Sequence, residues 1–507
     1  MSADQLPPSN GADTNVNIAD KSTAKELAND HLSEKDGLAY FAQFGVHEGL
    51  FRSVFDRALA RGASWADLYF EHSVSQSIGL MDGAVNQAST GVSLGVGVRV
   101  VCGDQTGYAY TEDLSKSAIL EAASSAALIA EGETSYHRPE GFEVRPLHSI
   151  YPIEQNWMNV SINDKVPILQ KLNEDAFSAD DRLIKVQVGM GHSERVVLIV
   201  ESTGAIHFDR QPMTRLNMSC TAQQGDQRES NGYNLAGREG FEFITDARLH
   251  QLQSEAVKRT QFLFDAKPAP AGSLPIVLGA GASGILLHEA IGHGMEADFN
   301  RKGISVYSDR INQRIAPKGV TIIDDGTRVG DRGAINVDDE GTVGQRTVLV
   351  EDGILRTYMH DRISAQHYGV EPTGNGRRQS FRHCPVPRMR STYMTAGEYP
   401  PEELIASVDR GIYAETFTNG QVMIGAGDFT FYIKTGYLIE DGKLTQPIKD
   451  TNIIGNGPEV LQKTDMVGSD FTFDEGGWVC GKDGQSVPVS LGMPSVRVSE
   501  ITVGGVS

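Results

Sequence analysis

The sequence predicts an α+β fold, in which an N-terminal α/β domain with a mixed sheet precedes a C-terminal domain of mainly antiparallel β-sheet. The first half alternates helical and strand-like segments, whereas the second half is rich in strands and contains Asp-Gly hairpin signatures. Between them, KPAPAGSLP (residues 267–275) carries three prolines and a glycine, as a connection between domains would. We therefore place the N-terminal domain at residues 41–266 and the C-terminal domain at residues 275–507.

The elements of the first half follow from periodicity and turn residues. Residues 1–40 are polar and charged, which predicts a disordered extension. Apolar residues at helical spacing predict helices over 46–59, 114–130, 163–179 and 247–264. Stretches rich in β-branched residues predict strands over 66–71, 77–80, 92–102, 185–190, 195–201 and 205–209, with a tight turn at Thr203-Gly204.

In the second half, the sequence predicts antiparallel strands joined by tight turns. Asp352-Gly353 separates strands over 347–350 and 354–358, and Asp441-Gly442 separates strands over 437–440 and 443–446. A short helix is predicted over 401–408. Two acidic stretches, 324–326 and 338–341, resemble Ca²⁺ loops in composition but lack the alternating ligand spacing, so we interpret both as turns.

Composition and charge limit the partners of the chain. Of its 507 residues, 66 are acidic and 45 are basic, which gives a net charge of −21. This field repels phosphate backbones and anionic lipid headgroups, so we expect no nucleic acid and no membrane among the partners. The first residues lack the basic and apolar regions of a secretory signal, and the cysteines stand at spacings unlike a disulfide framework. These features predict a cytoplasmic protein with reduced thiols.

One segment, LPIVLGAGASGILLHEAIGHGMEADFN (274–300), carries most of the chemistry. A strand over 275–278 leads through a glycine-rich turn into a short apolar helix over 285–291, which contains His288-Glu289-x-x-x-His293. Histidine is a common ligand of Zn²⁺, and a neighbouring glutamate can deprotonate a water that the metal activates. A glutamate between two histidines on an apolar helix would be costly to bury without an ion or a partner. The segment therefore predicts a metal site.

The spacing of the two histidines constrains the backbone. Ligands at i and i+4 lie about 40° apart around an ideal helix, whereas the i and i+5 spacing found here separates them by about 140°, too far to chelate one ion. We therefore expect the helix to widen into a π-type turn or to end at Gly292, with Gly292 and Gly294 permitting this departure.

A catalytic zinc usually keeps three protein ligands and one open position, so a third ligand must come from elsewhere. Cys480 is one candidate, because it lies in a glycine-flanked segment where Lys482 could help to hold a thiolate. Spacing alone does not choose between it and the other candidates, which are Glu296, Asp298, His383 and Cys384. Nitrogen and thiolate ligands suit Zn²⁺, Fe²⁺ and Co²⁺, with zinc the default by availability.

Other functions fit parts of the sequence. Gly279-x-Gly281-x-x-Gly284 follows a strand and opens a helix, as in nucleotide-binding proteins, with Asp309 as the acidic residue that would follow. The helix breaks at Gly292 and no parallel βαβ unit follows, so a tight strand-to-helix turn is the favoured interpretation. Alternatively, the cluster is a structural metal site in a non-enzymatic regulator, which four protein ligands would close.

The segment GNGRR (374–378) places Arg377 and Arg378 in a glycine-containing loop. Their guanidinium groups could contact a peptide carboxylate of the substrate or an oxyanion of the transition state. A solvent-exposed basic loop explains the same residues equally well.

Several segments together resemble the TldD branch of the TldD/PmbA metalloprotease family. They are LLHEAIGHGMEADFNRKG (286–303), VDDEGT (337–342), PTGNGRR (372–378), VCGKDGQSVPVSLGMPSVRV (479–498), DLYFE (67–71), GVGVRVV (95–101) and GYAY (107–110). The similarity runs in order from about residue 45 to the end of the chain and leaves the N-terminal extension unexplained.

This resemblance implies a soluble metallopeptidase in which His288, His293 and Cys480 bind the metal and Glu289 is the general base. It implies unstructured peptides as substrates, including antitoxins and precursors of modified peptides. It also implies a heterodimer with a paralogous TldE-like (PmbA-like) subunit that lacks the metal motif. Because this chain has the motif, it would be the catalytic partner.

Overall fold

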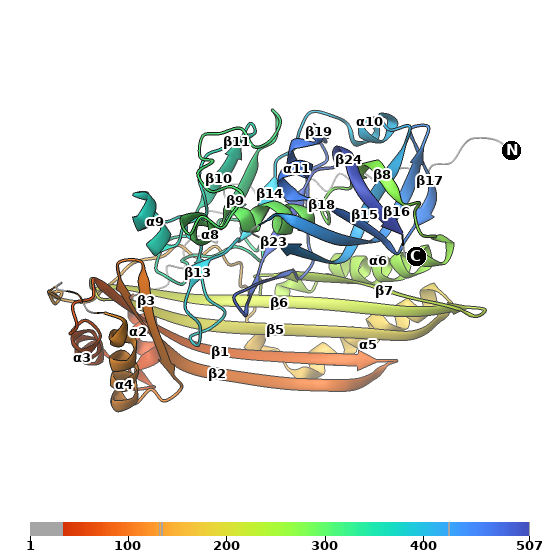
Figure 1. The fold of residues 1–507 in the computed structure, drawn as a ribbon. Coiled ribbons are helices and arrows are strands. Elements are labelled where there is room, and N and C mark those ends of the chain that lie inside the picture. The colour runs from red at the N-terminus through yellow and green to blue at the C-terminus, as the bar shows by residue number, and fades with distance from the viewer. Residues whose placement is uncertain (1–33, 131, 133–134, 424–425, 506–507) are drawn as a thin grey trace.

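The computed structural model describes residues 34–130, 132, 135–423 and 426–505. The first half forms a long sheet, and the strand-rich second half lies above it in Figure 1. Residues 1–33 of the predicted extension lie outside the described residues. Helix α2 (Glu34–Ala42) covers the last part of that extension and continues past residue 40.

The first half is built on a seven-stranded sheet in the order β3-β2-β1-β5-β6-β4, with β7 also beside β6. Neighbouring strands are antiparallel except β4 and β6, which are parallel, so the sheet is mixed. The strands are β1 (Trp65–Met81), β2 (Ala84–Cys102), β3 (Gln105–Thr111), β4 (Glu143–Val144), β5 (Leu183–Glu201), β6 (Ala205–Gln224) and β7 (Gln227–Gly237).

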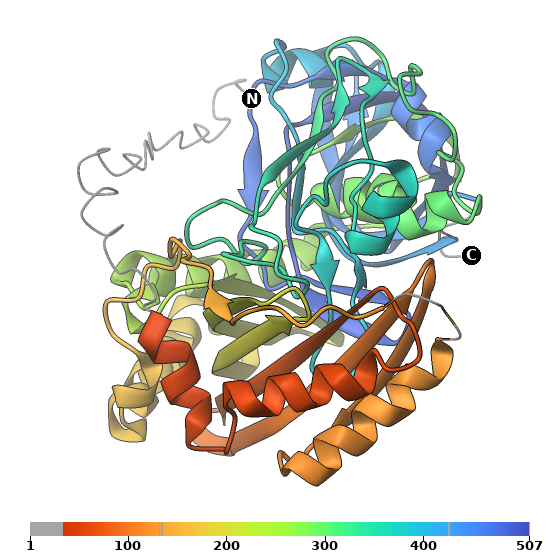
Figure 2. The same cartoon turned by 90° about the vertical axis from the view of Figure 1, so that its left-hand side faces the viewer.

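Helices cover this sheet in two groups. Leu68 and Phe70 of β1 pack in one core with α3 and α4, which Figure 2 shows on the side of the sheet turned away from the second half. Ile78 and Leu80, further along the same strand, belong to a second core with α5 and α6. The helices are α3 (Glu48–Ala58), α4 (Lys116–Ala126), α5 (Ile162–Ala179) and α6 (Asp246–Asp265), with short 3₁₀ turns at Ala127–Ile129, Trp157–Asn159 and Phe241–Phe243.

The long strands differ most from the sequence prediction. Strand β1 is 17 residues long and joins the two strands predicted over 66–71 and 77–80. Its intervening residues, 72–76, which are polar except for Val74, pair with both β2 and β5. Backbone pairing on both sides therefore continues the strand where side-chain hydrophobicity gives no signal.

Five strands of the second half close into a ring, because β15, β8, β24, β18 and β16 pair in that order and β16 pairs again with β15. All neighbours in this ring are antiparallel except β15 and β8. Strands β17 and β19 extend it along β16 and β24. The strands are β8 (Gly272–Leu278), β15 (Arg410–Met423), β16 (Asp428–Glu440), β17 (Lys443–Ile448), β18 (Thr451–Asn456), β19 (Thr464–Val467) and β24 (Val496–Gly505).

A second, six-stranded sheet has the order β11-β10-β9-β14-β23-β20, and two short hairpins, β12–β13 and β21–β22, stand apart from it. Its strands are β9 (Ile322–Asp325), β10 (Arg346–Glu351), β11 (Ile354–Leu355), β14 (Ser391–Met394), β20 (Thr472–Asp474) and β23 (Ser490–Met493). The hairpin strands are β12 (Gly376–Arg377), β13 (Val386–Pro387), β21 (Val479–Lys482) and β22 (Gln485–Pro488). The helices of this half are α7 (Gly284–Leu287), α8 (Ala297–Arg301), α9 (Arg362–Tyr368), α10 (Pro401–Ala406) and α11 (Gly457–Gln462).

The predicted turns of this half have mixed outcomes. Both Asp-Gly hairpins form, and Asp352, Gly353, Asp441 and Gly442 all have positive φ, as the tight turn requires. The stretch 338–341 is also a turn, closed by a hydrogen bond from the Gly341 N–H to the Asp338 carbonyl. The prediction of a turn at 324–326 is wrong for its first two residues, which end the buried strand β9.

Buried charges connect the two halves. Arg99 of β2 forms ion pairs with Asp67 of β1 and with Glu340 of the second half, and all three side chains are fully buried. The hydroxyl of Tyr69 donates to Asp339 over 3.1 Å. Because removing one partner of a buried ion pair leaves an uncompensated charge, these contacts fix how the halves meet. Among the described residues, no helix is long and apolar enough to cross a membrane.

Candidate metal centre

The backbone around the two histidines makes the π-type turn that their spacing predicts. Helix α7 passes into a π-helical segment over His288–Gly292, and the N–H of His293 donates to the carbonyl of His288, five residues back. The added residue in this turn brings His288 and His293 to the same side of the helix, with ring centroids 5.2 Å apart.

The glycines beside the histidines have a different role from the predicted one. Gly292 has an ordinary helical conformation (φ −59°, ψ −48°), so its freedom to adopt unusual angles is not used. A Cβ at this position would lie 2.2 Å from Sδ of Met389, and a Cβ at Gly294 would lie 2.8 Å from the ring of Tyr307. These glycines therefore leave room for close packing against the helix.

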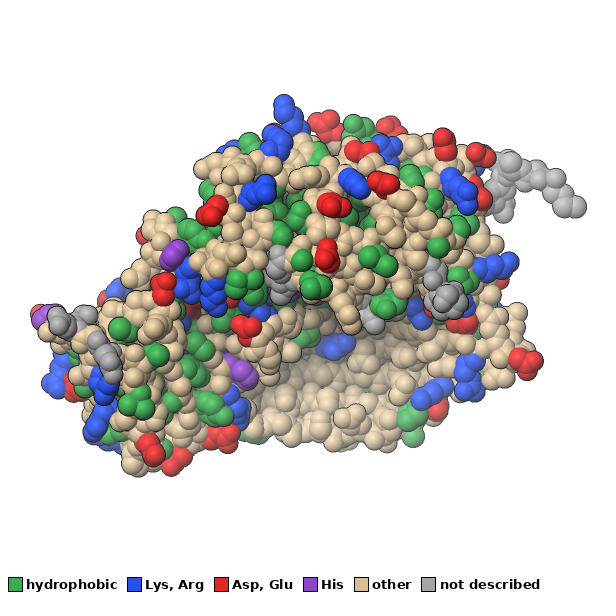
Figure 3. Space-filling view, in the orientation of Figure 1, with side chains coloured by type: hydrophobic (Ala, Val, Ile, Leu, Met, Phe, Trp, Pro, Cys, Tyr) green, Lys and Arg blue, Asp and Glu red, His purple; other side chains and the backbone are tan. Residues whose placement is uncertain are grey.

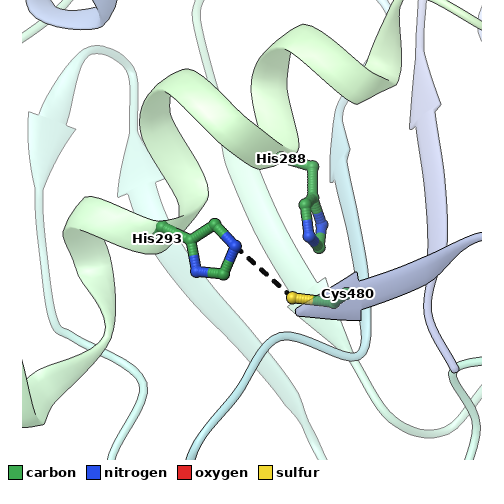
Figure 4. Close-up of side chains that lie close together, drawn as sticks. All are labelled: His288, His293 and Cys480. Carbon is green, nitrogen blue, oxygen red and sulfur yellow. Dashed lines mark hydrogen bonds between the residues drawn. The ribbon is translucent and has the colours of Figure 1, made fainter. Parts of the chain in front are cut away.

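Cys480 completes a cluster with the two histidines (Figure 4). One ligand atom from each of His288, His293 and Cys480 can be chosen so that all lie within 4.8 Å of one another. Sγ of Cys480 is 3.4 Å from Nε2 of His293, and the three residues are at most 2% exposed. Two imidazole nitrogens and a thiolate are a donor set that zinc prefers.

His288 provides a further sign that a ligand belongs in this space. Both of its ring nitrogens are buried, and neither has a hydrogen-bond partner among the described residues. Burying a polar group without a partner costs free energy, and buried polar atoms in proteins are nearly always paired. A metal ion bound by one of these nitrogens would supply the missing partner.

A buried network holds His293 in place. Nδ1 of His293 lies 3.0 Å from Oε2 of Glu296, and Nζ of Lys482 lies 3.0 Å from the same oxygen and 2.7 Å from Oδ1 of Asp298. Carboxylates that accept from the second nitrogen of a histidine fix the tautomer and direct the other nitrogen to a metal. Glu296 therefore orients the ring so that Nε2 faces Cys480.

The charges in the cluster favour a thiolate. Burial alone raises the pKa of Cys480, but the neighbouring His288 and His293 outweigh it and hold that pKa well below its usual value. Burial lowers the pKa of His293, whereas Glu296 and Cys480 raise it more strongly, well above its usual value. Burial raises the pKa of Glu296, but Lys482 and His293 lower it to about 2. The cluster thus supplies an ionised sulfur, the form that binds metals.

Glu289 stands beside the cluster and is the only one of its residues with substantial access to solvent. Its side chain is 24% exposed, and Oε2 lies 3.8 Å from Nε2 of His293. A carboxylate at this position faces the same space as the ligand atoms. It can therefore exchange a proton with a water held there.

The remaining third-ligand candidates lie in other interactions. Glu296 and Asp298 bind His293 and Lys482 as described above. Nδ1 of His383 is 3.1 Å from the Ser380 hydroxyl, and Cys384 is surrounded by charges of another region, including Arg99. The structure therefore brings together His288, His293 and Cys480, and the four cysteines are free thiols.

Arg377 and Arg378 lie outside the cluster and are buried rather than in an exposed loop. Arg377 donates to the carbonyls of Met389 and Pro488, and Arg378 donates to the Asp339 carbonyl over 2.9 Å. Both side chains also line a cavity next to the β21–β22 hairpin. These contacts are with backbone carbonyls and with this cavity.

Packing explains the glycines of the nucleotide-binding pattern. A Cβ at Gly279 would lie 2.6 Å from the Tyr413 hydroxyl, and one at Gly284 would lie 2.9 Å from the backbone nitrogen of Gly492. Gly281 has φ +77° and closes the strand-to-helix turn. The helix that follows is only four residues long before it widens. These features fit the tight turn that was favoured and leave no glycine to be explained by a cofactor.

Two contacts around Cys480 were not predicted from the sequence. Lys482 was noted as a neighbour of Cys480, but its ion pairs with Glu296 and Asp298 depend on a contact across 184 residues of sequence. Arg388 donates to the carbonyl of Cys480 over 2.6 Å and holds the strand that carries the thiol. Neither contact has a local sequence signal, because both form only when distant segments fold together.

Three domain models of one protein family match the chain in order. Residues 271–505 match the model of the PmbA/TldA metallopeptidase C-terminal domain, residues 66–130 match domain 1 of that family, and residues 156–261 match its central domain. The chain is 41% identical over 463 residues to a metalloprotease TldD homolog of Haemophilus influenzae, covering 89% of this chain and 95% of that protein.

More distant relatives extend the similarity. A zinc metalloprotease TldD homolog of Saccharolobus solfataricus is 28% identical, covering 88% of this chain and 97% of that protein. The crystal structure of TldE from Thermococcus kodakarensis has the same fold, with a TM-score of 0.69 at 18% identity, covering 90% of this chain and all of that one. All three domain models match in order, and the similarity to the Haemophilus influenzae metalloprotease homolog covers nearly the whole of that protein. The chain therefore belongs to the PmbA/TldD metallopeptidase family.

Proposed function

We propose that this chain is the catalytic, zinc-binding subunit of a peptidase that hydrolyses peptide bonds in unfolded or extended polypeptides. The observation that carries the proposal is the buried cluster of His288, His293 and Cys480 with Glu289 beside it. Its relatives are named metalloproteases, and one of them is named a zinc metalloprotease.

The donor atoms fit a catalytic metal. The cluster contains three possible protein ligands among the described residues, which leaves a coordination position for water or substrate, whereas a structural site would be closed by four. When bound by these residues, zinc polarises the scissile carbonyl and lowers the pKa of a water molecule. A non-enzymatic regulator with a structural metal site is therefore the weaker interpretation.

Different residues of the chain would bind the metal, orient a ligand and transfer the proton. His288, His293 and Cys480 hold the ion, while Glu296 orients the imidazole of His293. Glu289 accepts a proton from the attacking water and delivers it to the nitrogen of the leaving amine. Its partial exposure keeps it in contact with the solvent from which the water comes.

The arrangement of the two halves suits an extended substrate. Figure 3 shows a hollow between the second half and the long sheet on this face of the molecule. A cavity of about 610 Å³ lies beside β20 and the turn at Ala280–Ala282 that leads into the site helix. An extended peptide could add as a strand next to β20, where backbone hydrogen bonds give affinity with little sequence preference.

We further propose that the chain works as a heterodimer with a TldE-like subunit and acts on unstructured peptides, including antitoxins and precursors of modified peptides. The fold shared with TldE supports a pair of related subunits. Enclosure by two subunits would also protect folded proteins, since only an extended segment could reach the ligand cluster.

Substitution of Glu289 tests the chemistry. The Glu289→Gln variant should keep about one zinc per chain, measured by metal analysis, and lose cleavage of an unfolded protein. Retained cleavage by this variant would reject Glu289 as the base.

The partnership is tested by the time course of cleavage of one substrate protein, native and unfolded, with and without a TldE-like subunit. We expect cleavage of the unfolded form only, and mainly with both subunits present. Equal rates on the folded form would show that steric exclusion does not select the substrate.

A further inference from the structure

A cavity of about 290 Å³ lies between the long sheet and the second half, away from the metal ligands. Strands β5 and β6 form one wall, and the β21–β22 hairpin forms another through Val479, Val487 and Pro488. In β21, side chains alternate between two faces, so Val479 faces this cavity while Cys480, the next residue, faces the metal cluster.

Arginine dominates the lining. The cavity is lined by six arginine side chains and a single carboxylate, that of Asp339; the arginines are Arg195, Arg238, Arg332, Arg377, Arg378 and Arg390. Only Arg195 and Arg378 come within ion-pair distance of a carboxylate, at 3.9 Å and 3.7 Å. The other four are at most 7% exposed and form no ion pair with any described residue.

These four arginines are held by uncharged groups. Arg332 donates to the carbonyl of Trp478 over 2.9 Å, Arg238 to the carbonyl of Arg332 over 3.2 Å, and Arg390 to the carbonyl of Gly374 over 2.6 Å. Arg377 donates to two further carbonyls. Backbone carbonyls fix the direction of the guanidinium groups but do not neutralise their charge.

Burial and nearby arginines both disfavour the charged form of these guanidinium groups. Burial, together with neighbouring arginines, lowers the pKa of Arg332 to about 9 and that of Arg377 well below its usual value. Burial also lowers the pKa of Arg238; Tyr151 and Asp209 oppose this effect, and Arg390 and Arg195 add to it. Burying a charge without a partner costs free energy, so an anion bound in the cavity would lower this cost.

The carboxylates near the cavity accept hydrogen bonds from other groups. Asp339 accepts from the Tyr69 hydroxyl and from the backbone N–H of Arg378. Asp209 accepts from Tyr151 and Asn336, and it interacts with Arg238 at a distance without forming an ion pair with it. None of these acids lies within ion-pair distance of the four unpaired arginines, so the positive charge in the cavity remains.

We propose that this cavity is an oxyanion-binding site that takes a carboxylate of a peptide, with inorganic phosphate as a ligand of the same chemistry. Guanidinium groups match the planar, two-oxygen geometry of a carboxylate and also bind phosphate. The volume exceeds that of a single small anion and suits the last residues of a peptide. The peptide assignment rests on the proposed function, whereas the oxyanion site itself does not.

The experiment is a calorimetric titration of the full chain with three probes, at constant ionic strength set by sodium chloride. The probes are inorganic phosphate, N-acetyl-trialanine with a free carboxylate, and N-acetyl-trialanine amide. We expect phosphate and the free acid to bind saturably and to compete, and the amide to bind at least about tenfold more weakly, because charge-assisted hydrogen bonds are lost.

Two variants locate the site. Arg332→Gln should abolish binding of phosphate and of the free acid. Arg382→Gln is the control for the loss of one positive charge, because Arg382 forms an ion pair with Glu112 and does not line the cavity. Should Arg332→Gln fail to fold, the titrations of the unaltered chain still decide the question.

Each outcome has a definite consequence. Binding of phosphate but not of the free acid would keep the oxyanion site and overturn the peptide assignment. Absence of saturable binding by both, or equal loss in Arg332→Gln and Arg382→Gln, would overturn the site. These titrations measure binding without cleavage, so their failure is distinguishable from failure of the peptidase mechanism, which the Glu289→Gln variant tests.

Discussion

The buried contact between Glu296 and His293 leads to a specific prediction about metal affinity. Glu296→Gln keeps the size of the side chain and removes the charge that accepts from Nδ1 of His293 over 3.0 Å and from Nζ of Lys482 over 3.0 Å. Loss of such a partner of a metal-binding histidine typically weakens metal binding about 10- to 100-fold, or about 1.4–2.8 kcal/mol.

The cost to folding should be smaller than for a fully broken ion pair. Lys482 keeps its 2.7 Å contact with Asp298 and a 3.0 Å hydrogen bond to the carbonyl of Pro387. The free energy of unfolding should therefore fall by about 1–3 kcal/mol, rather than the 3–5 kcal/mol typical when a buried charge loses its only partner.

Asp298→Asn is the matched control, because Asp298 contacts the same lysine but not the histidine. Zinc affinity is measured by competition with a chromophoric chelator, and stability by urea unfolding of the metal-free protein. We expect both variants to lose stability and only Glu296→Gln to lose zinc affinity. Unchanged affinity in Glu296→Gln, or equal losses in both variants, would refute the role of Glu296 in orienting His293.

Three further predictions follow from other contacts. Cys480→Ser should lose zinc binding, measured by metal analysis, while Cys220→Ser, at an equally buried cysteine away from the cluster, should retain it. Gly292→Ala should lower the free energy of unfolding by about 1–3 kcal/mol, because its Cβ would clash with Sδ of Met389, and the additional substitution Met389→Ala should recover part of that loss. Burial and a nearby lysine lower the pKa of His192 from 6.5 to about 4. The neutral imidazole therefore contributes fully to stability above pH 6.5, and this contribution declines as the pH falls toward 4. His192→Phe should reduce the change in melting temperature between pH 6.5 and pH 4, and an unchanged pH dependence would contradict this assignment.

The sequence predicted local backbone geometry correctly where one short segment determines that geometry. The i and i+5 spacing of His288 and His293 required a departure from an α-helix, and the structure makes it as a π-type turn. The two Asp-Gly pairs, which tolerate positive φ, formed the predicted hairpins. In these cases the geometry depends on residues that are neighbours in the chain.

Features that depend on distant segments were not readable in this way. Residues 72–76, which are polar except for Val74, continue strand β1 only because β2 and β5 flank them on both sides. Asp324 looked like a turn residue, but it is buried in β9, where the Thr392 hydroxyl and the Asn375 amide donate to it. Residue types alone left several third ligands open, and only the folded chain brings Cys480 to the histidines.

One four-residue strand links the metal cluster to the arginine-lined cavity. In β21, Cys480 and Lys482 face the cluster, whereas Val479 faces the cavity. Arg388 donates a hydrogen bond to the carbonyl of Cys480 in the same strand. An anion bound by the arginines would lie against the same hairpin that carries the Cys480 thiolate. Because the two faces share one backbone, a shift of the strand would move the side chains on both faces together. The thiolate ligand and the cavity wall are therefore coupled by the covalent chain itself.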